Sequence, residues 1–325
     1  MENRLKEVIA FVNNKGGVAK TTSVQNVAAG MLLKDPTLRI LVIDLDPQCN
    51  LSSLMGWNAL KSSPKEKATV LGDSVAEPRP VAEPRPLPTI YDSLVAADED
   101  PLPPLHVYQS APGLYYIPAS NKLADADRVI NTQMQPKMAL SSILGSPLKI
   151  HSASATPKEE ATPNGAATVL GDFVAEPSTP ASPIYAEDIF DYILIDCPPS
   201  LSILTFNALA AATSVLIPVQ LGALSVDGIG NMLDAFSTVK RRINRDLTMR
   251  GLFIVMADER PIIARETIAL LKDTWGAHLL NTRIRQCVKV QESQWQRTDI
   301  FHHAPHCTAA QDYAALVDEL MKNEE

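Results

Sequence analysis

The sequence lacks the features that mark membrane, secreted and uniformly basic proteins. No apolar run approaches the roughly twenty residues that a membrane-spanning helix needs, so we expect no membrane span. The amino-terminal Met-Glu-Asn-Arg contains no apolar segment, so we expect no secretory signal. The formal charge of −8 excludes a surface that is basic throughout, and any contact with DNA must come from a local basic patch.

Cysteine is also scarce. The thiols of Cys49, Cys197, Cys287 and Cys307 show no C-x-x-C spacing. Isolated thiols of this kind are typical of a reducing compartment, so we expect a cytoplasmic protein. The chain does have ample apolar content for a core, and its 325 residues are enough for one large or two average domains.

A strand-like run, a loop of small residues and a helical pattern follow one another near the amino terminus. Val8–Val12 is apolar, Asn13–Ala19 contains the loop, and Lys20–Leu33 carries apolar residues at helical spacing. This order is typical of a phosphate cradle, because loop N–H groups and the helix dipole converge on anionic oxygens. In such a cradle Lys20 reaches the β- and γ-phosphates, and the Thr21 hydroxyl binds Mg²⁺.

The loop departs from the ordinary pattern G-x-x-x-x-G-K-[ST], because Asn14 and Ala19 stand where that pattern has glycine. It matches the deviant form K-G-G-x-x-K-[ST], which places Lys15 before Gly16 and Gly17. In this it resembles the ParA/MinD (Soj-like) deviant Walker A ATPase family. The resemblance implies that Lys15 reaches the partner subunit's phosphates in an ATP-sandwich homodimer. We expect a negative φ at Ala19, where a methyl group would otherwise be strained.

Acidic residues follow two strand-like runs. Asp44 and Asp46 come after the apolar run 38–43, and Asp196 ends the run that begins at Tyr192. Open α/β sheets bind ligands at the carboxyl ends of such strands. The resemblance implies that Asp44 and Asp196 serve Mg²⁺ and its waters, while Asp46 orients the attacking water. Taken alone, each acid could instead belong to a turn that ends a strand.

The resemblance extends through segments without catalytic residues, including Thr89–Leu94 and Leu123–Asp127, and to a Met256-x-Asp258-x-Arg260 motif near the nucleotide base. It implies ATP and Mg²⁺ as cofactors. The predicted catalytic residues are Lys15, Lys20 and Asp46. The predicted nucleotide-binding residues are Lys15, Gly16, Gly17, Val18, Ala19, Lys20, Thr21, Thr22, Met256 and Asp258. The predicted magnesium-binding residues are Thr21, Asp44 and Asp196.

Strand and helix patterns alternate along the chain, which predicts α/β architecture: a doubly wound, mostly parallel sheet in one ATPase domain over residues 1–325. Two proline-rich segments, 61–88 and 146–183, share near-copies at 68–78 and 167–177. Their composition cannot bury enough surface to offset chain entropy, so we expect disordered low-complexity insertions. Docking peptides or DNA-binding arms are the alternative for these segments.

A basic cluster is the best local candidate for contact with DNA. It consists of Lys240, Arg241, Arg242 and Arg245. Phosphate contacts would make binding steeply salt-dependent, whereas a solvated helix end also favours cations through the helix dipole. The family's non-specific DNA binding favours the first interpretation, and Arg283 and Arg285 could extend the cluster.

The resemblance implies a slow ATPase that dimerises, binds DNA and positions a plasmid, chromosome or large protein assembly. A ParB-like partner would activate it, and the nucleoid would be its location. The alternative is an ATP-switched DNA-bound regulator or scaffold with vestigial hydrolysis. MinD-like membrane attachment would need a basic amphipathic carboxyl-terminal helix, whereas residues 309–325 end in an acidic run.

Histidine and cysteine side chains elsewhere in the chain are of the types that bind zinc or iron–sulfur clusters. His302, His303, His306 and Cys307 match no regular zinc spacing. Cys197 has no second candidate ligand for an iron–sulfur cluster in a comparable motif. We therefore expect neither a zinc site nor a cluster.

Overall fold

The computed structural model describes residues 3–57, 87–151, 183–222 and 225–322. Most of the two predicted insertions, residues 61–86 and 152–182, lies outside these ranges. One predicted boundary needs correction. Strand β5 (Leu148–His151) falls inside the range 146–183 and pairs with the sheet, so the folded chain continues through residue 151.

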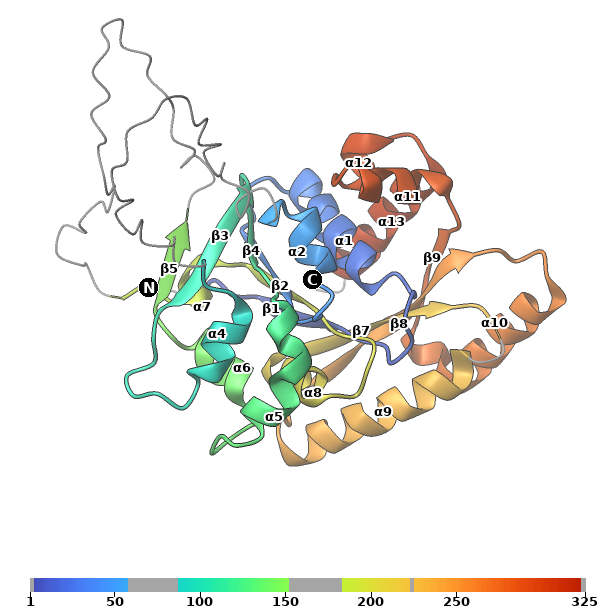
Figure 1. Cartoon of the computed structure of the whole chain (residues 1–325). Helices are drawn as coiled ribbons and strands as arrows, with labels where there is room; N and C mark the ends of the chain where they lie inside the picture. Colours follow the sequence, from blue (N-terminus) through green and yellow to red (C-terminus); the bar gives the residue numbers. More distant parts are fainter. Residues whose placement is uncertain (1–2, 58–86, 152–182, 223–224, 323–325) are drawn as a thin grey trace, which may run out of the picture.

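The described residues form a nine-stranded sheet with the order β5-β3-β4-β2-β6-β1-β7-β8-β9 (Figure 1). Besides β5, its strands are β1 (Glu7–Phe11), β2 (Ile40–Asp44), β3 (Leu105–Ala111), β4 (Leu114–Ile117), β6 (Tyr192–Asp196), β7 (Ser214–Gln220), β8 (Thr248–Ala257) and β9 (Leu279–Arg285). Only the pairing of β3 with β4 is antiparallel. The predicted mostly parallel α/β sheet is therefore confirmed, with a mixed edge formed by β3 and β5.

Helices cover both faces of the sheet, which makes the fold doubly wound (Figure 1). On one face lie α1 (Lys20–Lys34), α2 (Asn50–Leu54), α12 (Ile300–His303) and α13 (Thr308–Lys322). The other face carries α4 (Ile90–Val95), α5 (Ala126–Ile130), α6 (Ala139–Leu144), α8 (Ile203–Ala211), α9 (Ser225–Arg242) and α10 (Ile262–Trp275). The remaining helices are α7 (Ala186–Ile189), α11 (Val288–Trp295), η1 (Asn121–Asp125) and η2 (Gly276–His278).

Alternate residues of each central strand enter different cores. In β1, Val8 and Ala10 pack with the α8 and α9 face, whereas Ile9 and Phe11 pack with α1 and α13. Because both faces are covered, the central strands read as continuous apolar runs rather than alternating ones. For this reason the positions of these strands could be predicted from the sequence.

At the two longer gaps, 58–86 and 152–182, the chain leaves and re-enters the described ranges along the mixed edge of the sheet. Trp57 packs edge-on against Tyr108 of β3 with ring centroids 4.9 Å apart. The Tyr108 hydroxyl donates to the Pro88 carbonyl at 3.1 Å. The Leu148 N–H of β5 donates to the Ile184 carbonyl at 2.8 Å. The four ends that flank these two gaps therefore meet strands β3 and β5.

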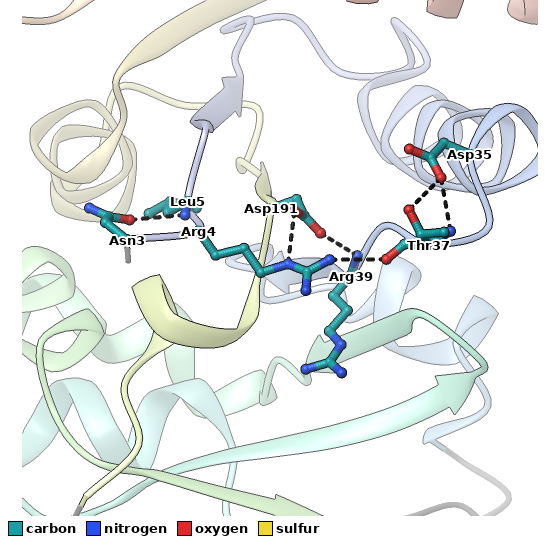
Figure 2. Close-up of polar contacts among 7 residues, drawn as sticks. All are labelled: Asn3, Arg4, Leu5, Asp35, Thr37, Arg39 and Asp191. Carbon is teal, nitrogen blue, oxygen red and sulfur yellow. Dashed lines mark hydrogen bonds and ion pairs between the residues drawn. The ribbon is translucent and has the colours of Figure 1, made fainter. Parts of the chain in front are cut away.

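A buried carboxylate ties the amino ends of three strands together (Figure 2). Asp191, which precedes β6, accepts from Arg4 Nε at 2.9 Å and from the Arg39 N–H at 2.7 Å. Arg4 also donates from Nη2 to the Thr37 carbonyl at 3.0 Å. Arg4 precedes β1 and Arg39 precedes β2, so one side chain fixes the relative positions of β1, β2 and β6.

We predict that Asp191→Ala lowers the free energy of unfolding by about 2–3 kcal/mol, because it leaves a backbone N–H and a guanidinium without their charged acceptor. Asp318→Ala is the matched control. Asp318 pairs with Lys34 at 2.7 Å, but both side chains are exposed, so a change below about 1 kcal/mol is expected. Urea denaturation measures both variants. Equal losses would contradict the role given to Asp191.

Candidate active site

A pocket of about 600 Å³ opens at the carboxyl ends of the central strands. One wall is the loop before α1 and the first turn of that helix. The opposite wall comes from β8, β9, α11 and α13. The lining includes Gly16, Gly17, Val18, Ala19, Lys20, Thr21, Thr22, Asp46, Pro199, Met256, Arg285, Cys287, Gln294, Arg297 and Tyr313.

The loop before α1 curls around the ammonium group of Lys20. This group donates to the Asn13 carbonyl at 2.9 Å and to the Lys15 carbonyl at 3.1 Å. Asn13 fixes the loop further: its Nδ2 donates to the Pro218 carbonyl at 2.8 Å, and its Oδ1 accepts from the Lys15 N–H at 2.9 Å. Burial lowers the pKa of Lys20, although nearby Asp196 favours its charge. A desolvated cation held in a loop of small residues suits an anionic ligand.

The expectation of a negative φ at Ala19 is wrong. Its φ is 55°, in the left-handed region, and Gly17 nearby has a φ of 74°. Such a conformation costs an alanine about 1–2 kcal/mol. The loop accepts this cost because the residue immediately precedes α1, and its carbonyl already accepts the Ser23 N–H at 2.9 Å. The turn into the helix therefore dictates the conformation.

Two buried carboxylates lie side by side at the ends of neighbouring strands, where Asp44 of β2 is in register with Asp196 of β6. Asp196 Oδ2 accepts from the Thr21 hydroxyl at 2.6 Å. Its Oδ1 is buried and has no hydrogen-bond partner within the part of the chain that the structure describes. Burial, with the charge of Asp44, raises the pKa of Asp196 well above its ordinary value. An oxygen left in this state fits a site that a cation or its water completes.

Asp44 organises the loop that follows β2. Its Oδ2 accepts from the Ser52 N–H at 2.8 Å and the Ser52 hydroxyl at 2.6 Å, and its Oδ1 accepts from the Asp46 N–H at 3.0 Å. Burial raises the pKa of Asp44 to about 6. The carboxylate thus positions Asp46, whose Oδ1 accepts the Gln48 N–H at 2.9 Å and which lines the pocket. The predicted role of Asp44 in supporting Mg²⁺ and its bound waters stays a prediction.

The residues predicted beside the nucleotide base separate in the structure. Met256 lines the pocket, whereas Asp258 is not among the lining residues. Asp258 instead accepts two hydrogen bonds from the Arg260 guanidinium, at 2.8 and 2.7 Å, and one from the Arg260 N–H at 3.2 Å. The role predicted for Asp258 as a nucleotide ligand stays a prediction.

Sequence reasoning missed the wall formed by the carboxyl-terminal helices. Gln294 of α11 donates to the Thr22 hydroxyl at 2.6 Å, and Tyr313 of α13 bonds the Ser23 hydroxyl at 3.1 Å. These contacts join residues more than 250 positions apart in sequence. No local motif marks them. The amphipathic pattern of 309–322 predicts a helix but not the pocket that it helps to close.

The basic cluster lies at the other end of the sheet. Lys240, Arg241 and Arg242 end α9, and the loop after them leads to the first residue of β8. Arg283 and Arg285 pair in register with Ile254 and Ala257, near the last residues of β8. Strand β8 therefore runs from its first residue, beside the basic cluster, to Ile254 and Ala257, beside the two arginines. At about 3.3 Å per residue, this length of strand separates the basic cluster from Arg283 and Arg285 by roughly 20–30 Å.

The predicted extension of the cluster to Arg283 and Arg285 is therefore wrong. Each of these arginines also has an acidic partner: Arg283 pairs with Glu259, and Arg285 binds Asp312 at 2.7 Å. The cluster itself retains its four predicted members, all exposed.

The histidines near the carboxyl terminus have ordinary partners. His302 Nδ1 lies 2.7 Å from Asp299 Oδ2, and His303 Nε2 lies 3.3 Å from Glu292 Oε2. In the described ranges no group of three or more His, Cys, Asp or Glu side chains could hold a metal ion. Within the same ranges, no helix has the length and apolar character needed to cross a membrane.

Comparison with known proteins assigns the family. A profile of the family described as an AAA domain matches residues 6–149 and 184–249, well over half of the chain. The chromosome-partitioning ATPase Soj of Treponema pallidum (strain Nichols) is 28% identical over 317 residues, covering 97% of each chain. The chain belongs to this family, in its ParA/Soj-like branch. The family predicted from the sequence motifs is therefore confirmed.

Solved structures place this ParA-type chain in the same fold class. Cobyrinic acid a,c-diamide synthase from Mycobacterium smegmatis, with bound ATP analogue and magnesium, is 24% identical with a TM-score of 0.62, covering 98% of this chain and 96% of that one. A plasmid partition protein from Borrelia burgdorferi is 17% identical with a TM-score of 0.57, covering 98% and 97%. At these identities the likeness establishes the fold alone.

We predict that Asp196→Asn raises the free energy of unfolding of the ligand-free protein at pH 7 by about 1–3 kcal/mol, because it removes a buried charge with an unpaired oxygen. The pKa of Asp196 is raised on folding, so the native state holds the proton more tightly than the unfolded chain. Stability from Asp44, whose pKa rises to about 6 on folding, therefore falls as pH rises from about 4 through 6, and the contribution of Asp196 also falls as pH rises above about 4.

Urea denaturation between pH 4 and 8 without Mg²⁺ measures this change. Asp258→Asn is the control, since Arg260 lowers the pKa of that partly exposed carboxyl to about 2, and no gain is expected. A loss of stability in Asp196→Asn at pH 7 would mean that favourable contacts, not a missing cation, govern this carboxylate.

Proposed function

We propose that this chain is an ATP-dependent partition ATPase that uses Mg²⁺. The observation that carries the proposal is the pairing of a phosphate-type loop with Asp196, whose Oδ2 accepts from the Thr21 hydroxyl and whose buried Oδ1 has no hydrogen-bond partner among the described residues. The names of relatives that partition chromosomes and plasmids support the same reading. So do nucleotide and magnesium in a solved structure of this fold.

The chain's own residues supply positioning and charge. Loop N–H groups and Lys20 would bind the phosphates, and Thr21 with Asp196 would hold Mg²⁺, which neutralises phosphate charge when bound. Asp46 reaches the pocket from a loop that Asp44 holds in place. This placement suits a group that orients a water for in-line attack, since hydrolysis of this kind depends on positioning rather than on a protein nucleophile.

Lys15 would complete the site of a second subunit. Its side chain is half-buried at the loop, and none of the contacts among described residues involves its ammonium group. Its backbone is fixed on both sides, because the N–H donates to Asn13 and the carbonyl accepts from Lys20. A fixed lysine with an uncommitted charge is suited to a partner's phosphates, so ATP would close a homodimer.

Turnover would be slow without a partner, because the pocket has no arginine finger in its cradle motifs. A ParB-like protein would activate hydrolysis at the closed dimer. Intact Asp44, Asp46 and Asp196 favour this motor over an ATP-switched regulator or scaffold with vestigial hydrolysis.

Two substitutions separate the steps. We predict that Asp46→Ala lowers ATP turnover by about 100-fold or more, because the attacking water loses its acceptor, while ATP-dependent dimers persist. Lys15→Gln should abolish both dimers and turnover and leave the folded monomer intact. Phosphate release in the presence of DNA measures turnover, and sizing chromatography with ATP measures dimers.

Asp318→Ala serves as the control for Asp46, since it removes an exposed carboxylate outside the pocket lining and should leave turnover unchanged. If wild type and Asp46→Ala hydrolyse ATP equally slowly under all conditions, the regulator is the better description. Dimers that persist in Lys15→Gln would contradict the trans role of this lysine.

We also propose that the basic cluster binds DNA without sequence preference, which would place the protein on the nucleoid. Lys240 donates to the Leu247 carbonyl at 2.7 Å, so part of its capacity is used. Arg241, Arg242 and Arg245 are exposed, and no ion pair with a described carboxylate engages them. Three exposed guanidinium groups at one helix end form a compact phosphate-binding surface despite the net charge of −8.

We predict that the double change Arg241→Ala with Arg242→Ala weakens DNA binding and reduces the slope of log K against log salt by about 2, since about 0.9 counterion is released per phosphate contact. Fluorescence anisotropy with duplex DNA at several salt concentrations measures it. Arg283→Ala, which removes an arginine already paired with Glu259, should leave the slope unchanged. An unchanged slope in the double variant would remove DNA binding from this surface.

A further inference from the structure

Two adjacent hydroxyl groups in the first turn of α1 differ in the direction of their hydrogen bonds. Thr21 donates its proton to Asp196 Oδ2 at 2.6 Å. Thr22 instead accepts a proton, because Gln294 Nε2 of α11 donates to its Oγ1 at 2.6 Å. Thr21, Thr22 and Gln294 all line the pocket. The two hydroxyl groups therefore offer different atoms to a ligand of the pocket.

A hydroxyl group has one proton and two lone pairs, so the partner that it already has decides what else it can bind. Thr21 gives its proton to a carboxylate and keeps lone pairs, which suit a cation. Thr22 has an amide donor on its oxygen and keeps its proton, which suits an anion. Within the described part of the chain, no residue accepts the proton of the Thr22 hydroxyl. That proton is therefore available to a ligand.

The wall that carries Gln294 is fastened to the same turn of α1 by a buried asparagine. Asn26 Nδ2 donates to the Thr22 carbonyl at 2.8 Å, and Asn26 Oδ1 accepts from the Ile300 N–H at the start of α12, also at 2.8 Å. Asn26 and Ser293, which precedes Gln294 in α11, are each 1% exposed. These contacts hold the backbone of the wall at a fixed distance from Thr22.

The amide of Gln294 decides which way the Thr22 proton turns. The hydroxyl groups of helical threonines commonly donate to a backbone carbonyl one turn earlier in the helix. With an amide hydrogen bound to its oxygen, the Thr22 hydroxyl instead directs its proton away from Gln294. Lys20 and Thr21 precede Thr22 in the same turn and line the same pocket, so an anion bound at this turn is the fitting acceptor.

We propose that Gln294 is a positioning residue for the nucleotide phosphates: its amide fixes the Thr22 hydroxyl as a donor to a phosphate oxygen. This role rests on the proposed ATP binding and adds a side chain of α11 to the phosphate site. Gln294 acts through Thr22, so its contribution belongs to the phosphates and not to the base. Loss of the amide frees the Thr22 proton to turn to the helix backbone, while the contacts of Lys20 and Thr21 remain in place.

The test is a double-mutant cycle on the full chain with Mg²⁺, in which isothermal titration calorimetry measures the binding of ATP and of inorganic triphosphate. Gln294→Met keeps the length of the side chain and removes the amide, and Thr22→Val keeps the shape and removes the hydroxyl. Each single change should weaken the binding of both probes about tenfold, the loss expected for one hydrogen bond to a charged group. The double variant should bind about as weakly as either single variant, because both changes remove the same contact.

Three further variants separate positioning of the hydroxyl from packing of the wall. Thr22→Ser keeps the hydroxyl and should bind triphosphate as the wild type does. Gln294→Glu places a carboxylate that can only accept against the Thr22 hydroxyl, so triphosphate binding should be weaker than in Gln294→Met. Gln296→Met is the matched control, since it removes an exposed amide outside the pocket lining, and it should leave the binding of both probes unchanged.

Losses that add up in the double variant, to about a hundredfold, would overturn the proposal, because Gln294 and Thr22 would then act independently. A loss of ATP binding with unchanged triphosphate binding would also overturn it, because Gln294 would then contact the base. The proposed function fails in a different way. A wild-type protein that binds neither probe would overturn the ATP site and this role with it, whereas a Gln294→Met variant that binds both probes as the wild type does would overturn the positioning role alone.

Discussion

The closeness of two buried carboxylates is the constraint on which the site depends. Asp44 and Asp196 end adjacent parallel strands in register, so the sheet itself holds like charges together out of water. The two carboxylates differ in the hydrogen bonds that they receive. Among the described residues, the Asp44 carboxylate receives three hydrogen bonds and organises the loop after β2, whereas the Asp196 carboxylate receives one and has one oxygen without a partner. This asymmetry distinguishes an acid that organises a loop from the acid that we propose binds Mg²⁺.

The sheet also separates two kinds of positive charge. The cradle around Lys20 lies at the carboxyl ends of the strands, and the arginines of the basic cluster lie at the far end of α9. Helix α9 spans the distance between them, about 27 Å for its eighteen residues. Near its start, Gly228 lies so close to Asn14 that a Cβ there would be 2.9 Å from Asn14 Oδ1. A straight helix therefore runs from the loop to the basic surface.

The local pattern of apolar and polar residues was sufficient to predict the central strands, helix α1 and the acids at the strand ends. The reason is that strands of a parallel sheet covered on both faces are unbroken apolar runs in the sequence. The local pattern did not predict conformations and contacts that depend on packing between segments far apart in the sequence. The left-handed Ala19 follows from the turn into α1, not from its own preference. Gln294 and Tyr313 reach the phosphate loop through helix packing that no spacing encodes. Arg283 and Arg285 were assigned to a surface that strand direction places far away.

The mixed edge of the sheet has a consequence for how such a chain can change length. Residues 57, 88, 148 and 184 all meet β3 or β5, on the side of the sheet away from β8 and β9. Segments added between these anchor points need only return to the same border strands, whatever their length. A reporter domain or an epitope inserted at this edge of the sheet would therefore leave the geometry of the pocket and of the basic cluster unchanged.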